Sequence, residues 1–181
     1  LETITKVLTA AAQSDDNFTI DENTDILATY RDRVIDAYFV DCEGKKAGES
    51  MNLGKDDLKN IQVASTSDLK KQNDIIKKIE KGDADAAKSL RLPVYVFDIN
   101  DQTITVLPIY GAGLWGPVWG YLAFAQDGRS IDGAIFDHKS ETPGLGAKIA
   151  EEPFYGQFKG RKLTDEGGFS VVKGGARGDI N

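Results

Sequence analysis

Apolar residues recur every three to four positions in two segments of the chain, and this period predicts two helices. The first segment runs from Thr3 to Ala12 and reads as a short amphipathic helix. The second runs from Ser67 to Asp83, opens on a serine suited to an N-cap and stops near Gly82. The apolar face comprises Ile4, Val7, Leu8, Ala11 and Ala12 in the first helix, and Leu69, Ile75, Ile76 and Ile79 in the second.

Runs rich in β-branched and aromatic residues predict strands. Val34–Val40 reads as a strand that leads into the turn "DCEGK". Two hairpins are expected further on, the first from Val94–Ile99 and Thr103–Ile109, the second from Val118–Ala125 and Ile131–Asp137. Tight turns join these strands instead of crossover helices, so the predicted class is α+β, with an antiparallel sheet of hairpins flanked by helices.

The remaining segments carry weaker patterns. Residues 44–67 are polar and read as a surface excursion, with the core elsewhere. The segment 147–160 reads as a short helical piece, and "GFSVVKG" at 168–174 as a last strand. We expect one soluble domain over 1–181, with an N-terminal helix and strand region at 1–90 and a second half at 91–181.

Charge and composition narrow the classes of partner. The chain has 181 residues and a formal net charge of −7, which repels a phosphate backbone, so nucleic acid is not an expected partner. Cys42 is the single cysteine, which excludes an intrachain disulfide and a thiolate zinc cluster. No apolar run reaches the roughly 20 residues that span a bilayer.

The segment "GAGLWG", Gly111 to Gly116, matches the dinucleotide fingerprint G-x-G-x-x-G, but only weakly. That fingerprint opens a helix beneath the pyrophosphate, whereas Pro117 and the β-rich "VWGYLAF" follow here. We therefore interpret the segment as a glycine-rich connection between strands. Its neighbours Trp115, Trp119 and Tyr121 suit either core packing, which is the commoner role of aromatic residues, or a wall against a flat ring.

His138 is the only histidine, and its acidic neighbours Asp137 and Glu141 could orient it as a base. No serine or cysteine stands at motif spacing, so a catalytic triad has no support, and a surface histidine at a strand end is the preferred interpretation. No catalytic and no metal-binding residues are assigned.

"ETPGLG", Glu141 to Gly146, has the residues of a loop that backbone can use to approach a ligand. Pro143 fixes one φ angle, Gly144 and Gly146 permit positive φ or close contact, and Leu145 projects an apolar side chain. The pattern fits a turn into the following helix as well as it fits a seat for a planar ligand.

Three segments together, "LWGPVWGYLAF", "IFDHKSETPGLGAKI" and "FYGQFKGRKL", resemble the FMN-binding domain family of the C subunit of the sodium-translocating NADH:quinone oxidoreductase, with the G subunit of the Rnf complex as a relative. The resemblance runs from about Tyr110 to the C-terminus and is most specific at "H-x-x-E-T-P-G-L-G". It implies an FMN-binding fold in which the second half of the chain is the flavin-binding half.

The resemblance also implies a function and a site. The function is that of an electron-carrying subunit that passes electrons from NADH towards quinone, coupled to sodium export. Thr142, Gly144, Leu145 and Gly146 would lie against the flavin, Glu141 and Lys148 nearby, and Leu114 and Trp115 as a second wall. The expected partners are the other subunits of the complex. The expected location is the inner membrane of a Gram-negative bacterium, with the domain facing the periplasm.

The chain departs from the family pattern at the flavin attachment. The family esterifies FMN to a threonine of an S-G-A-T motif, and this chain contains no S-G-A-T. We expect that threonine beyond Asn181 and a membrane anchor before Leu1, and in this particular chain a non-covalent or empty flavin site. Two alternatives remain: an Rnf G-like flavin carrier, and a non-redox extracytoplasmic binding or assembly domain.

Overall fold

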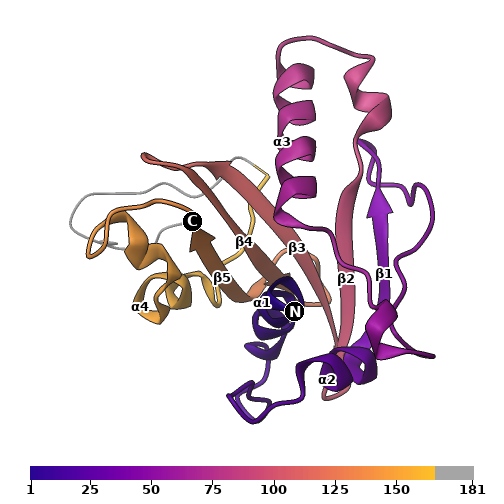
Figure 1. Ribbon diagram of the computed structural model, residues 1–181, viewed down its shortest axis with the longest axis vertical. Coiled ribbons are helices and arrows are strands. Elements are labelled where there is room, and N and C mark those ends of the chain that lie inside the picture. The colour runs from indigo at the N-terminus through magenta and orange to yellow at the C-terminus, as the bar shows by residue number, and fades with distance from the viewer. Residues whose placement is uncertain (166–181) are drawn as a thin grey trace.

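One antiparallel sheet organises the computed structural model, which describes residues 1–165 (Figure 1). Its five strands are hydrogen-bonded in sequence order, so each strand pairs with the next one along the chain. They are β1 (Val34–Val40), β2 (Leu92–Ile99), β3 (Gln102–Ala112), β4 (Pro117–Phe124) and β5 (Ile131–His138). The α+β class and both hairpins are confirmed. The expected strand at 168–174 lies outside the described residues.

In the described part of the chain, four α-helices accompany the sheet. They are α1 (Glu2–Ala12), α2 (Ile26–Arg33), α3 (Thr66–Glu80) and α4 (Glu152–Tyr155), with short 3₁₀ turns η1 (Leu58–Asn60), η2 (Ala86–Ser89), η3 (Gly146–Ala150) and η4 (Gly156–Phe158). The predicted helices correspond to α1 and α3, and the short helical piece to η3, α4 and η4. Within residues 1–165, no helix combines the length and hydrophobicity needed to cross a membrane.

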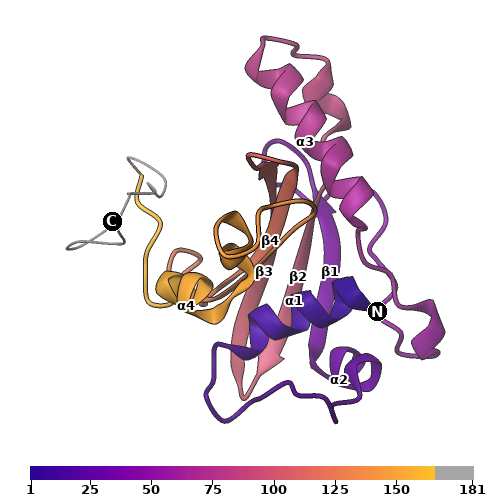
Figure 2. The ribbon, with the colours of Figure 1, turned by 60° about the vertical axis from the view of Figure 1, so that its left-hand side comes forward.

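The main core lies between α1 and one face of the sheet. In Figure 2, α1 crosses the strands, and it contacts β2, β3, β4 and β5. Its apolar stripe includes Val7 and Leu8 and packs on alternate residues of the strands, as expected of an amphipathic helix. Tyr30 of α2 completes this core with an edge-to-face contact to Phe97, the ring centroids 5.5 Å apart.

The prediction for residues 44–67 was wrong in one respect. The segment is largely irregular, but it is not a surface excursion, because the side chains of Met51 and Ala64 are buried in the main core. Its backbone also bonds to the fold, since Met51 N donates to the carbonyl of Ala37. The N-cap of α3 was misplaced as well: Ser65, two residues before the predicted start, accepts from Asp68 N and forms a capping box with that residue.

A smaller apolar cluster covers the opposite face of the sheet at β4 and β5. The helical segment after β5 folds back so that Phe154 and Phe158 pack on Phe136, with ring centroids 5.1 to 5.8 Å apart. Buried Leu122 and Phe124 lie beneath this layer. The cluster anchors the chain that follows the loop 141–146, and so limits where that loop can lie.

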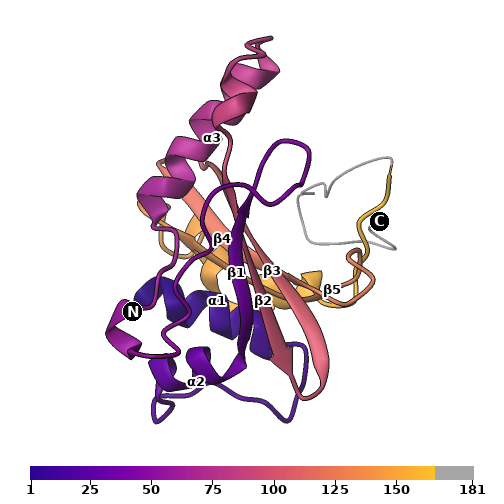
Figure 3. The same ribbon diagram turned by 90° about the vertical axis from the view of Figure 1, so that its right-hand side faces the viewer.

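Both outer strands carry additional hydrogen bonds on their free sides. The side-chain amide of Gln13 donates to Ala134 O at 2.8 Å and accepts from Ala134 N at 3.2 Å, as a neighbouring strand would. On the other side, β1 lies at the edge that faces the viewer in Figure 3. There Ala47 N donates to Phe39 O at 2.9 Å.

Candidate functional site

The β3–β4 hairpin ends in a tight turn that exposes two large apolar side chains. Gly113 N donates to Gly116 O at 2.7 Å, which leaves Leu114 and Trp115 at the tip. Their side chains are 82% and 65% exposed. A strand follows the turn directly, so the dinucleotide-binding interpretation of "GAGLWG" is excluded, and the glycine-rich connection is confirmed.

The loop after β5 places a third apolar side chain in solvent. Leu145 N donates to Thr142 O at 3.1 Å, and Gly144 has a φ of +74°. Pro143 followed by a residue with positive φ is the pattern of a type II turn, which explains the proline and the glycine in "TPGL". Leu145 is 73% exposed at the end of this turn.

The buried carboxylate of Glu141 joins the two loops. Its Oε1 accepts a hydrogen bond from Trp115 N at 3.0 Å. A Cβ atom at Gly113 would overlap Oε1, and one at Gly146 would overlap Oε2. The two glycines therefore leave room for a carboxylate between the hairpin tip and the start of η3. A buried charged group is costly unless it is hydrogen-bonded. The bond from Trp115 N to Glu141 therefore holds the two loops in one relative position.

His138 supports the same junction from the end of β5. Its Nδ1 accepts from Glu141 N at 3.3 Å. Asp137 does not orient the imidazole, because its carboxylate faces Lys6 at 3.0 Å and accepts from His138 N. Burial opposes the charge on Lys6, yet hydrogen bonds to Asp137 and Glu2 raise the pKa of its ammonium. The position at a strand end is confirmed, and the imidazole is half-buried.

The predicted site residues fall into two groups. Leu114, Trp115, Thr142, Gly144 and Leu145 lie exposed on the two joined loops. The second group lies beneath or after the exposed loops. Glu141 is buried, Gly146 packs on its carboxylate, and Lys148 lies on η3. The sequence did not predict the hydrogen bond through which Glu141 joins the two loops. Its only sign in the sequence is the pair of glycines at 113 and 146.

The aromatic residues near the hairpin divide between the two roles considered for them. Tyr121 is buried in the main core, and burial raises the pKa of its hydroxyl to about 12. Trp119 is half-buried and borders an apolar cavity of about 400 Å³ together with Ile109, Phe136 and Phe158. Trp115 alone of the three stands exposed.

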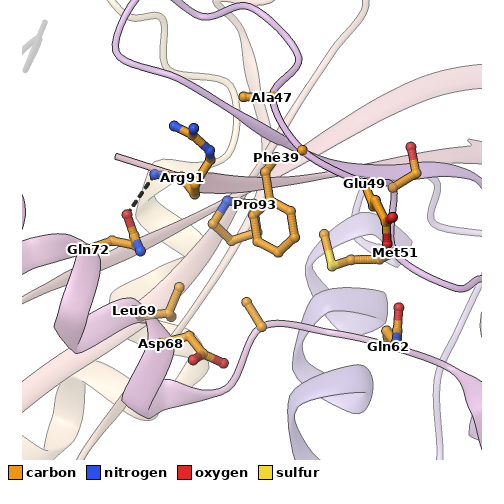
Figure 4. A pocket seen from close by; sticks show the side chains of 13 residues that line it. Phe39, Ala47, Glu49, Met51, Gln62, Asp68, Leu69, Gln72, Arg91 and Pro93 are labelled. Atoms are coloured by element: carbon orange, nitrogen blue, oxygen red, sulfur yellow. Dashed lines mark hydrogen bonds between the residues drawn. The ribbon is translucent and has the colours of Figure 1, made fainter. Parts of the chain in front are cut away.

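A larger cavity, of about 570 Å³, lies away from these loops between β1, the segment 47–51 and the start of α3 (Figure 4). Three of its polar side chains serve the fold. Gln72 accepts from Arg91 N at 2.7 Å, Gln62 accepts from Asn52 N at 2.9 Å, and Asp68 belongs to the capping box of α3. We therefore do not assign a ligand to it. Residues 1–165 contain no group of three or more histidine, cysteine or acidic side chains placed to hold a metal ion.

The joined loops suit a planar, largely apolar ligand. Three large apolar side chains stand in solvent on adjacent turns, and no Cβ of Gly144 obstructs the approach of a ring to its backbone. These residues fit an isoalloxazine ring, which has two broad faces to cover. The polar groups available beside the ring are Thr142 and the backbone of the turn.

Comparisons with known proteins found similar sequences and structures. Residues 113–179 match the model of the FMN-binding domain family. The C subunit of the Na(+)-translocating NADH-quinone reductase of Vibrio vulnificus is 30% identical over 162 residues, which covers 80% of this chain and 64% of that relative. The chain thus spans less than two thirds of the length of this relative.

Two solved structures have the same fold. The crystal structure of the Na(+)-translocating NADH-quinone reductase C subunit from Parabacteroides distasonis superposes with a TM-score of 0.66 at 25% identity, covering 98% of this chain and 74% of that one. The structure of NqrC from Shewanella oneidensis gives 0.62 at 19% identity, covering 98% and 81%, and supports the fold alone. Residues 113–179 thus resemble the FMN-binding domain family, and the chain has the fold of the C subunit of the Na(+)-translocating NADH-quinone reductase.

Proposed function

We propose that this chain carries FMN as an electron-transferring subunit of a sodium-translocating NADH:quinone reductase. The observation that carries the proposal is the pair of loops joined by Glu141, which present Leu114, Trp115 and Leu145 to solvent. The match of residues 113–179 to the FMN-binding domain family supports the choice of ligand. The names of its relatives support the choice of complex.

The protein's contribution is to position the ring and to control its surroundings. Leu114 and Trp115 would cover the ring from the hairpin and Leu145 from the loop 142–145, which would exclude water from part of its surface. The hydroxyl of Thr142 is available to hydrogen-bond the ring or the ribityl chain. When bound, a flavin accepts and releases one or two electrons, and the residues around it set its potential. No general acid or base is needed for this task.

The direct test is flavin binding by the purified chain. We expect FMN to bind with quenching of its fluorescence, and we expect Leu114→Ala with Trp115→Ala to weaken binding without loss of folded protein. A matched control is Ile35→Ala, because Ile35 is also an exposed apolar residue, 52% exposed, but lies on β1. A chain that binds no flavin, or a control that weakens binding as much as the double variant, would contradict the site.

The same proposal assigns no NADH chemistry to this chain. The one sequence resembling a dinucleotide fingerprint forms a hairpin turn, so electrons must reach the flavin from another subunit. We expect no oxidation of NADH by the purified chain with FMN, measured from the absorbance of NADH. Turnover above the rate of free FMN would overturn this part of the proposal.

We further propose that the complete protein follows the family in its attachment and location. FMN would be esterified to a threonine in an S-G-A-T motif that follows Asn181, and an N-terminal anchor would hold the domain at the periplasmic face of the inner membrane. The relative from Vibrio vulnificus is longer than the matched region, which leaves room for such segments. Mass spectrometry of the full-length protein after proteolysis tests the ester, and protease accessibility in spheroplasts tests the side of the membrane.

A further inference from the structure

A second cavity adjoins the candidate flavin site on its α3 side. It has a volume of about 510 Å³ and lies between α3 and the end of the β3–β4 hairpin. Figure 2 shows α3 rising beside that hairpin. Gly113 and Gly116, the two glycines that close the hairpin turn, line this groove, so it is continuous with the tip that carries Leu114 and Trp115.

The two walls of the groove differ in chemistry. The α3 wall is polar and comes from one face of the helix, with the side chains of Thr66, Ser67, Lys70, Asn73, Asp74 and Lys77. The hairpin wall has Tyr110 and Trp119 beside glycines. At Gly111 on this wall a Cβ atom would meet nothing within 4 Å, so space is open above the backbone.

The charge of the lining is positive although the chain as a whole is negative. Three lysines face one aspartate: Lys70 and Lys77 from α3, Lys139 from the segment after β5, and Asp74. Lys70 is paired with Asp74 at 2.9 Å. Lys77 and Lys139 have no ion pair with any residue in the part of the chain that the structure describes. In a chain of net charge −7, a cavity lined by two more ammonium groups than carboxylates favours an anionic ligand.

We propose that this groove receives the phosphate of FMN and that Lys77 and Lys139 are the residues that recognise it. This inference rests on the proposed function. Gly113 and Gly116 flank Leu114 and Trp115 and also line the groove, so a ring held against those two side chains would have the groove beside it for its chain and phosphate. The ammonium groups then supply charge-assisted hydrogen bonds to phosphate oxygens. A phosphoester to a threonine keeps one negative charge, so the same lysines serve the attached flavin.

The proposal predicts a difference between two flavins that differ only in the phosphate. We expect the purified chain to bind FMN about tenfold more tightly than riboflavin, the difference that one charge-assisted hydrogen bond confers. Lys77→Gln and Lys139→Gln should each reduce that ratio and leave the dissociation constant of riboflavin unchanged. Inorganic phosphate should displace FMN and not riboflavin.

The control is Lys78→Gln, which makes the same change of charge on the next residue of α3, outside the groove lining. If it lowers FMN affinity as much as Lys77→Gln, the effect is general electrostatics and the groove is not a phosphate site. Equal affinity for FMN and riboflavin would overturn this inference and leave the proposed function standing. Failure of both flavins to bind would overturn the two together.

Discussion

The backbone amide of Trp115 donates a hydrogen bond of 3.0 Å to the carboxylate of Glu141. This contact joins the tip of one hairpin to the loop that follows the last strand, although the residues are 26 positions apart. Because both loops carry exposed apolar side chains, their relative position determines the shape of the proposed flavin site. The carboxylate therefore acts as a positioning group beneath the site.

Replacing Glu141 by alanine should destabilise the fold and weaken flavin binding together. The substitution leaves Trp115 N without its acceptor and opens a void between Gly113 and Gly146, at a cost of about 1–3 kcal/mol in the free energy of unfolding. Glu141→Gln keeps an acceptor oxygen and should lose less of both. Urea unfolding and FMN titration measure the two effects. If Glu141→Ala changed neither the free energy of unfolding nor the affinity for FMN, Glu141 would not hold the loops together.

Alanine at either glycine that faces Glu141 should be poorly tolerated. A Cβ at Gly113 or Gly146 overlaps the carboxylate, and overpacking of this kind costs about 1–3 kcal/mol. The matched control is Gly111→Ala on the same hairpin, where the new methyl group meets nothing within 4 Å. Its unfolding midpoint in urea should stay close to that of the parent chain. Similar loss of stability in all three variants would show that the hairpin, not the carboxylate, requires glycine.

Two buried tyrosines should respond in opposite ways to removal of their hydroxyl groups. The hydroxyl of Tyr95 accepts a hydrogen bond from Ala64 N at 2.9 Å, so Tyr95→Phe leaves a buried amide unpaired and should cost about 1–3 kcal/mol. The hydroxyl of Tyr30 is buried with no partner in residues 1–165, and Tyr30→Phe should be neutral or stabilising. Thermal unfolding of the two variants side by side checks the contrast, and an equal loss in both would contradict it.

A charge at Leu145 should affect the flavin and leave the fold intact. Leu145 is 73% exposed, so Leu145→Glu adds no buried charge to the folded protein, but it places a carboxylate against the proposed ring. We expect FMN to bind at least about tenfold more weakly, or its midpoint potential to fall, because a negative charge beside the ring opposes its gain of electrons. Full occupancy at an unchanged potential would count against the role of this loop.

The turn between β4 and β5 should make stability depend on pH in acid. Hydrogen bonds from Ser130, from its hydroxyl first and then its backbone, together with Arg129 N lower the pKa of Asp127 from 3.8 to about 2. A lowered folded-state pKa means that this stabilisation is present above pH 3.8 and is lost as the pH falls through 2. Asp127→Asn should thus melt earlier than the parent at about pH 5, and the difference should shrink towards about pH 2. A constant difference would be inconsistent with titration of Asp127.

Much of the fold could be predicted because local patterns and tertiary structure agree. The strand runs and the stripe of α1 all contribute a face to the main core, so their local patterns are enough to locate them. By contrast, α2 is only eight residues long: Tyr30 is buried, Ile26 and Leu27 are partly buried against the core, and this short run shows no clear helical period. That β1 joins the sheet beside β2 is a long-range pairing, which no local pattern specifies.

The candidate site was predicted less completely, for a physical reason. Exposed residues such as Leu145 stand out in a loop sequence because an apolar side chain there needs an explanation. A buried carboxylate gives no such signal, because Glu141 reads as one more acidic surface residue until the hairpin tip is brought against it. The groove lined by Lys77 and Lys139 likewise depends on α3 and the β3–β4 hairpin meeting, although the two lysines are 62 positions apart in the sequence.

The side chain of Gln13 hydrogen-bonds to the backbone N–H and C=O of Ala134 on β5. On the other side of the sheet, the backbone of segment 45–51 hydrogen-bonds to β1. These contacts leave fewer free amides and carbonyls at which a strand from a second molecule could add. Strand addition at a free sheet edge is a route by which protein molecules aggregate. The covered edges therefore disfavour strand addition and leave the loops and grooves as the surfaces open to a partner.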